Sequence, residues 1–169
     1  MEINDLEIYE NKLHIDDRGS FIRFYDKSIN AKNLSIEQTN LSINPRKGTL
    51  RGMHFQTSGP PENKFMKLLS GEIFLAIVDL RKDEETYLNI VQKTLKSEDQ
   101  QTIFIPSGCA TGWISLAENS NIVYLMTSKY EECTYSGFKY NDAAVSISWP
   151  MEPLVVSNQD ITWPKLKIK

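Results

Sequence analysis

Residues 65–80 read Phe-Met-Lys-Leu-Leu-Ser-Gly-Glu-Ile-Phe-Leu-Ala-Ile-Val-Asp-Leu. Two runs suited to β-strands, 65–69 and 72–80, flank Ser70-Gly71, a pair typical of a two-residue hairpin turn. The second run is apolar almost without interruption, which predicts a strand buried on both faces. This stretch indicates a chain built from β-strands.

Further strand patterns recur on both sides of this stretch, separated by turns rich in Gly, Pro, Asn and Asp. Many short strands at roughly eight-to-twelve-residue spacing predict a sandwich or small barrel. We therefore expect an all-β fold, a sandwich or small barrel with short helices, forming a single domain over residues 1–169. One short helix is predicted at 26–33, and 151–169 reads as a tail that packs across the body. The expected strands are 21–25, 36–42, 65–69, 72–80, 88–95, 101–105, 110–116, 121–127 and 145–149.

The composition narrows the class of function. The formal net charge is −3 with acids and bases scattered, so nucleic acid is not an expected partner. The only basic bias, Pro45-Arg46-Lys47 followed by Arg51, suits a phosphate-bearing small molecule. No apolar run approaches membrane-spanning length and the N-terminus carries no leader-like segment, so we expect a cytoplasmic protein without a membrane partner. Cys109 and Cys133 form no metal-binding or disulfide pattern.

The chain holds two histidines, His14 and His54. Imidazole gains and loses a proton near neutral pH, so His54, in Leu50-Arg51-Gly52-Met53-His54-Phe55-Gln56, is the candidate acid/base group. Composition alone favours a packed core histidine instead. Two histidines without an H-x-H pattern do not build a His-rich metal site, so we expect no metal and no cofactor.

A series of motifs occurs in order along residues 16–160: Asp17-Arg18-Gly19-Ser20-Phe21, Gln38-Thr39-Asn40, Gly48 to Gln56, Lys64, Gly71-Glu72-Ile73, Val78 to Lys82, Ile105 to Gly108, Tyr124, Asn141-Asp142, Ile147 to Pro150 and Ser157 to Asp160. Together these motifs resemble the dTDP-4-dehydrorhamnose 3,5-epimerases, sugar-nucleotide epimerases of the cupin-like type. The resemblance implies a jelly-roll or cupin-like β-sandwich. Because of this resemblance, we favour an acid/base role for His54 over that of a packed core histidine.

The resemblance implies a metal-free epimerase of a nucleotide-diphosphate 4-keto-6-deoxy sugar, inverting C3, C5 or both through an enolate. It implies that His54 is the base, Asp160 its orienting partner, Tyr124 the opposite-face acid and Lys64 the enolate stabiliser. It also implies a homodimer, which the predicted strand 21–25 could support by adding to a neighbour's sheet. The implied substrate-binding residues are Arg18, Arg51, Gln38, Asn40, Thr111 and Lys129.

Each assigned residue also has a structural interpretation. Tyr124 could be a buried packing residue, Lys64 a solvated lysine, Asp160 a surface acid and Arg51 the partner of a carboxylate. Two other functions stay open: a ketoisomerase or single-site epimerase on another nucleotide sugar, and a non-catalytic sugar-nucleotide binding protein. Retention of a base and an acid together argues against the binding protein.

The sequence departs from the family pattern at three positions. Thr111 replaces a second histidine that contacts the sugar, and threonine cannot carry a proton charge at neutral pH. Arg23 stands where the family often has glutamate, and Lys129 where it often has an aromatic residue that stacks on the base. We therefore expect a narrowed reaction, dominated by one stereocentre.

Overall fold

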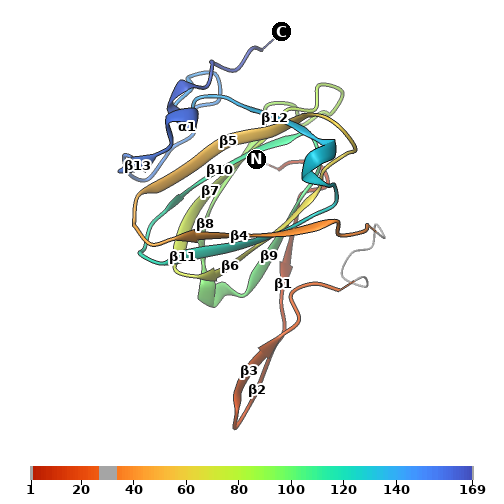
Figure 1. Ribbon diagram of the computed structural model, residues 1–169, viewed down its shortest axis with the longest axis vertical. Coiled ribbons are helices and arrows are strands. Elements are labelled where there is room, and N and C mark those ends of the chain that lie inside the picture. Colours follow the sequence, from red (N-terminus) through yellow and green to blue (C-terminus); the bar gives the residue numbers. More distant parts are fainter. Residues whose placement is uncertain (1, 27–33, 169) are drawn as a thin grey trace.

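The computed structural model describes residues 2–26 and 34–168. Its strands form two main antiparallel sheets that face each other as a sandwich (Figure 1), which confirms the predicted fold class. The five-stranded sheet has the order β1 (Glu7–Glu10), β9 (Gln101–Ile105), β6 (Lys64–Ser70), β11 (Ser120–Met126) and β4 (Gln38–Asn44). The six-stranded sheet has the order β12 (Thr134–Gly137), β5 (Thr49–Ser58), β10 (Cys109–Ser115), β7 (Glu72–Asp79) and β8 (Ile90–Lys96), with β13 (Val155–Val156) parallel to β5.

A two-stranded hairpin and three short helices complete the described elements. The hairpin, β2 (Leu13–Asp16) and β3 (Gly19–Ile22), projects away from the sandwich (Figure 1). Two 3-10 helices, η1 (Ser97–Asp99) and η2 (Tyr130–Glu132), lie in connections, and helix α1 (Asn158–Thr162) follows β13. None of the helices in the described ranges is long and apolar enough to cross a membrane.

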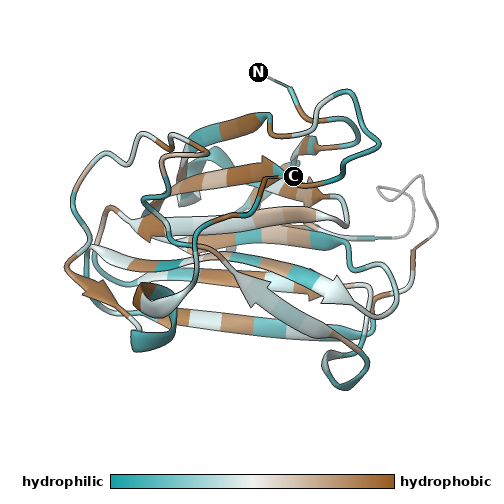
Figure 2. Ribbon diagram, turned by 90° about the horizontal axis from the view of Figure 1, so that it is seen from above, coloured by the Kyte–Doolittle hydropathy of each residue, from teal (hydrophilic) through white to brown (hydrophobic). Residues whose placement is uncertain are grey.

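The hydrophobic core has two layers because β7 is buried on both faces, as its apolar run predicts. Ile73, Leu75 and Ile77 point between the sheets, where they join side chains from β6, β9 and β11. Ala76 and Val78 alternate with them and point to the outer face. Figure 2 shows hydrophobic and hydrophilic residues alternating as brown and teal bands along the strands of the sandwich.

The C-terminal region covers the outer face of the six-stranded sheet, as expected for a tail packing across the body. Val145, Ile147, Trp149 and Leu166 all pack against the outer cluster. The predicted strand at 145–149 is wrong, because this segment pairs with no strand. Apolar and polar residues alternate in this segment because one of its sides packs on the outer cluster. Its backbone makes no strand pairing there, since the Ser148 N–H donates to the Gln92 side chain.

The predicted hairpin turn at Ser70-Gly71 is also wrong. β6 and β7 belong to different sheets, so the two residues form a corner between the layers. Gly71 has φ +80°, and a Cβ there would lie 2.4 Å from the Ser120 Oγ. Glycine is required by both the backbone conformation and the close approach.

The other predicted strands are confirmed, most of them with ends that differ from the prediction. Predicted strand 21–25 is in fact the hairpin strand β3, which ends at Ile22. Most of the helix predicted at 26–33 lies outside the described residues. β5, the strand that carries His54, was not among the predicted strands.

Candidate active site

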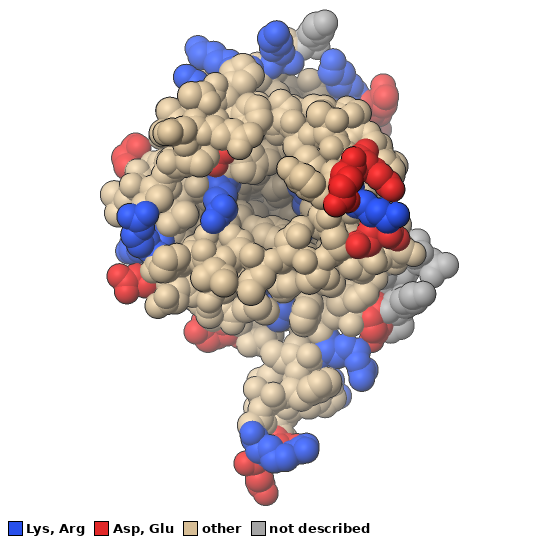
Figure 3. All heavy atoms as spheres, in the orientation of Figure 1, with Lys and Arg blue, Asp and Glu red and all other residues tan. Residues whose placement is uncertain are grey.

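A cavity of about 460 Å³ lies between the two sheets, within the size range of small-molecule sites. Figure 3 shows the opening as a hollow with basic side chains on its wall, within a largely uncharged rim. Its lining residues are Asn40, Ser42, Arg51, His54, Lys64, Met66, Ile105, Thr111, Trp113, Tyr124, Met126 and Tyr130. A neighbouring hollow of about 310 Å³ shares His54, Lys64 and Tyr130 and adds Gln38, Glu62 and Trp163 among others.

The two sheets supply different walls of this cavity. His54 on β5 and Thr111 on β10 are direct register partners in the six-stranded sheet. Lys64 on β6 and Tyr124 on β11 belong to the five-stranded sheet. A ligand between the sheets would therefore meet His54 from one side and Tyr124 from the other.

Close contact between β5 and β10 sets the position of His54. The pairing is irregular between Thr111 and Trp113. Gly52 has φ +124°, and a Cβ there would lie 2.5 Å from the Gly112 Cα. A side chain at Gly52 would push the strands apart and move His54, two residues away on the same strand.

His54 and Asp160 form a hydrogen-bonded pair with 2.6 Å between Nε2 and Oδ1. The Asp160 carboxylate also accepts hydrogen bonds from the Gly52 N–H at 3.2 Å and from Trp163 Nε1 at 3.2 Å. Burial alone would raise the pKa of Asp160, but the hydrogen bonds, that of His54 above all, hold it below its usual value. An ionised Asp160 accepts the Nε2 proton, which leaves Nδ1 as the basic nitrogen of the neutral ring.

Helix α1 brings Asp160 to His54 from 106 residues along the chain. Ser157 caps the helix by accepting the Asp160 N–H at 3.0 Å. Ser157, Asn158 and Asp160 are common residues at a helix start, so the local sequence explains the helix. No local signal in the sequence reveals its contact with β5.

Lys64 is almost buried and has two polar neighbours. Its Nζ lies 3.4 Å from Thr111 Oγ1 and 3.6 Å from Glu62 Oε1. Burial lowers the pKa of Lys64, and the Glu62 carboxylate opposes that effect. Glu62 is itself held by Ser128 at 3.0 Å and by the Tyr135 hydroxyl. Sequence reasoning missed Glu62, whose only signal was its place two residues before Lys64.

Trp113, on the opposite sheet, orients Tyr124. The Trp113 Nε1 donates a hydrogen bond to the Tyr124 hydroxyl at 2.6 Å. Burial raises the pKa of Tyr124, only partly opposed by Trp113 and Arg51, so the hydroxyl keeps its proton at neutral pH. A protonated phenol in a ligand cavity is able to act as an acid.

The predicted substrate-binding residues divide into two groups. Arg51, Asn40 and Thr111 line the main cavity, and Gln38 lines the neighbouring hollow. Arg18 lies in the projecting hairpin, 90% exposed and paired with Asp16, so this chain does not bring it to its own cavity. Lys129 pairs with Glu132 at 3.5 Å and is absent from both linings.

Tyr130, beside Lys129, is the aromatic residue at the cavity mouth that the sequence reasoning missed. Its ring is 64% exposed and stacks on Tyr135, with centroids 5.4 Å apart. Lys129 as a ligand contact stays a prediction: at η2, Tyr130 lines the cavity and Lys129 pairs with Glu132.

Asp79, the last residue of β7, has its hydrogen-bond partners in the loop that follows the strand. Asp79 is fully buried, but its carboxylate is bound by Arg81 at 2.7 Å and by Thr86 Oγ1 at 2.6 Å. In this chain Asp79 therefore serves the loop after β7. Among the described residues, no group of three His, Cys, Asp or Glu side chains is placed to hold a metal ion.

Comparison with known proteins agrees with this geometry. The family model described as dTDP-4-dehydrorhamnose 3,5-epimerase matches residues 1–167. The chain belongs to this family. It is therefore an isomerase.

Individual family members are similar over nearly their whole length. The enzyme from Methanothermobacter thermautotrophicus is 34% identical over 95% of this chain and 89% of its own. The structure of the Bacillus anthracis enzyme, solved with TDP and pyrophosphate, is 30% identical with a TM-score of 0.88 and covers 98% of both chains. A Legionella pneumophila family member, solved with dTDP-4-keto-L-rhamnose, is 27% identical with a TM-score of 0.87 and covers 99% of this chain and 97% of its own.

Proposed function

We propose that this protein epimerises a dTDP-linked 4-keto-6-deoxy sugar by proton transfer across the cavity. The observation that carries the proposal is the placement of His54, paired with Asp160 of α1, on one sheet and of Tyr124 on the other. Hydrogens on C3 and C5 are acidic because each carbon neighbours the C4 carbonyl. Inversion requires a base on one face of the sugar and an acid on the other, which is the arrangement that the two walls offer.

In the proposed reaction, His54 Nδ1 removes a proton from the carbon beside the carbonyl and the negative charge moves to O4. The Lys64 ammonium, kept cationic by Glu62, stabilises that oxygen. Tyr124 then donates its proton to the opposite face of the carbon. Arg51, at the cavity wall, binds the diphosphate through its planar guanidinium.

Two observations support a dTDP-linked substrate: the ligands of the similar proteins and the residues at the cavity mouth. The Bacillus anthracis and Legionella pneumophila enzymes were solved with TDP and with a dTDP-sugar. Here the exposed ring of Tyr130 offers the base a flat apolar surface that Lys129 does not. We therefore propose Tyr130 as the base contact, with Gln38 and Asn40 beside it.

We expect one stereocentre to dominate the reaction. Thr111 lies 3.4 Å from Lys64 Nζ, in the place of a histidine that would share or carry a proton. A neutral hydroxyl holds the sugar less firmly through two successive enolates, and one such contact is worth about 1–3 kcal/mol. The rates at C3 and C5 should therefore differ by about tenfold or more.

Proton NMR in deuterated water measures both positions in one experiment. Incubation with dTDP-4-keto-6-deoxyglucose should give fast deuterium incorporation with inversion at one carbon and slow incorporation at the other. Equal, fast incorporation with inversion at both carbons would refute the dominance of one stereocentre but would agree with the proposed epimerase activity. Migration of the carbonyl, or no exchange at all, would contradict the proposed function itself.

We also propose a homodimer formed through the outer face of the five-stranded sheet. Leu41, Ile43 and Leu69 are exposed large apolar residues, of which Ile43 is 65% exposed. Ile15 and Phe21 on the projecting hairpin are exposed as well. Apolar surface gathered in this way is typical of an association site. In such a dimer, the hairpin would carry Arg18 to the phosphate site of the other protomer.

Sedimentation equilibrium at micromolar concentration should give twice the 19.4 kDa mass of one chain. Ile43→Arg should shift the protein to monomer because it places a charge in an apolar contact. Leu154→Arg is the matched control, since Leu154 is equally exposed but lies beside β13 on the other sheet. A monomeric parent protein, or the same loss of dimer in both variants, would refute the interface.

We propose a cytoplasmic location. Cys109 and Cys133 are both unpaired in the structure. Free thiols are typical of proteins kept in a reducing compartment.

A further inference from the structure

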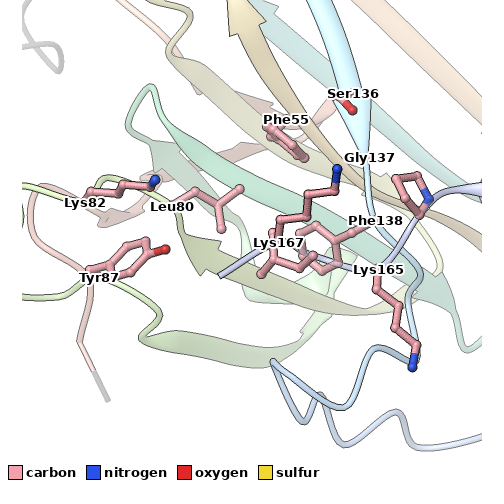
Figure 4. A pocket seen from close by; sticks show the side chains of 11 residues that line it. Phe55, Leu80, Lys82, Tyr87, Ser136, Gly137, Phe138, Lys165 and Lys167 are labelled. Atoms are coloured by element: carbon pink, nitrogen blue, oxygen red, sulfur yellow. The ribbon is translucent and has the colours of Figure 1, made fainter. Parts of the chain in front are cut away.

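A second hollow lies on the opposite side of β5 from the catalytic cavity. Successive side chains of a strand point to opposite faces, so His54 lines the catalytic cavity while Phe55 lines this hollow. Its volume is about 370 Å³. The surrounding residues come from β5, β12, the loop after β7 and the C-terminal tail (Figure 4): Phe55, Leu80, Lys82, Tyr87, Ser136, Gly137, Phe138, Pro164, Lys165, Leu166 and Lys167.

The floor of this hollow is apolar. Phe55, Leu80 and Leu166 pack against buried Phe138 in the outer hydrophobic cluster but are themselves only partly buried. The tail that forms one wall is fixed in place, because the Leu166 N–H donates to the Asp142 carboxylate at 2.6 Å and the Lys139 N–H to the Pro164 carbonyl at 3.2 Å. An apolar molecule entering here would cover surface that the fold leaves partly open.

The rim is basic. Lys82 approaches from the loop after β7, and Lys165 and Lys167 come from the tail on the other side (Figure 4). No lining residue is acidic. Within residues 2–26 and 34–168, none of these three ammonium groups has an ion-pair or hydrogen-bond partner. Three unpaired cations around one hollow make a local excess of positive charge in a chain whose net charge is −3.

We propose that this lysine-rimmed pocket binds an amphipathic organic anion, with an apolar ring system on the floor and an anionic group held by Lys82 and Lys167. The floor offers hydrophobic contact and the rim offers charge, and neither alone would select this class of ligand. The pocket lining contains no histidine and no carboxylate. Binding is therefore expected without chemistry, separately from the sugar nucleotide.

The probe is 8-anilinonaphthalene-1-sulfonate, whose fluorescence rises in an apolar site. N-phenyl-1-naphthylamine is the matched neutral probe, because it keeps the rings and lacks the sulfonate. We expect the sulfonate to bind about tenfold or more tightly than the neutral probe at low salt, and this preference to shrink as ionic strength rises. Equal affinity for the two probes would overturn the role of the lysines.

The double variant Lys82→Glu/Lys167→Glu tests the location of binding. Both side chains are exposed, so the fold is retained, which circular dichroism checks. The variant should weaken sulfonate binding about tenfold or more and leave the neutral probe almost unchanged. Lys96→Glu, at an exposed lysine at the end of β8 outside the pocket lining, makes the matched control. Unchanged binding in the double variant, which would place the probe elsewhere, or equal weakening in the control, would overturn the proposal.

Discussion

His54→Asn is expected to lower kcat/KM for the proposed epimerisation by about 10³-fold or more. Asparagine keeps a polar side chain at the cavity wall, but it has no nitrogen that accepts a proton at neutral pH. His14, the other histidine, lies on the projecting hairpin and cannot replace it. The decisive measurement is deuterium exchange at C3 and C5 by NMR, which should disappear together with inversion.

A graded control separates loss of the base from loss of its orientation. Asp160→Asn keeps the imidazole but replaces the carboxylate that accepts the Nε2 proton, so the ring loses its preferred tautomer. We expect an intermediate loss of about 10²-fold. Retention of solvent exchange in His54→Asn would remove His54 from the mechanism, and a fully active Asp160→Asn enzyme would remove Asp160 from the pair.

The sequence predicted the β-sandwich because burial leaves a clear mark on strands. β7 is apolar throughout since it lies between two hydrophobic layers, and its boundaries differ from the prediction by one residue. The same kind of pattern led to a wrong prediction at 145–149. There apolar and polar residues alternate because one side of the segment packs on the outer face of the sheet, without strand pairing. Periodicity reports which side of a segment is covered, but hydrogen-bond partners depend on distant chain segments.

The corner at Ser70-Gly71 shows the same limit in a turn. A positive φ and a tight reversal are common to hairpins and to corners between sheets, so the two residues fit both. The deciding contact is with Ser120, almost fifty residues away. β5 was not predicted as a strand because Gly52 and polar residues interrupt its apolar pattern, and these are the residues that shape the site.

The candidate site was predictable as a set of residues only through the family resemblance. His54 alone stood out by chemistry, as one of two histidines. The joining of Asp160 to His54, and of Glu62 to Lys64, depends on the docking of α1 and of the loop before β6. Lys129 and Tyr130 are neighbours in sequence, and only the turn of η2 decides which one faces the cavity.

Tyr124→Phe is expected to separate two steps that His54→Asn removes together. The variant loses one hydroxyl, whereas the ring still packs against the core between the sheets. His54 can still take a proton from the sugar and return it to the same face, so exchange with solvent should fall by less than about tenfold. Inversion requires a proton from the other sheet and should fall by about 10²-fold.

The ratio of inversion to exchange is the informative quantity, because a merely structural tyrosine would reduce both rates equally. The hydroxyl also accepts a hydrogen bond from Trp113 Nε1, so its loss leaves that donor facing the cavity. Trp113→Phe is the matched control: it removes the same hydrogen bond from the other side but retains the phenol. We expect Trp113→Phe to keep a parental ratio at a moderately lower rate. A parental ratio in Tyr124→Phe itself would mean that water or another group, and not Tyr124, supplies the second proton.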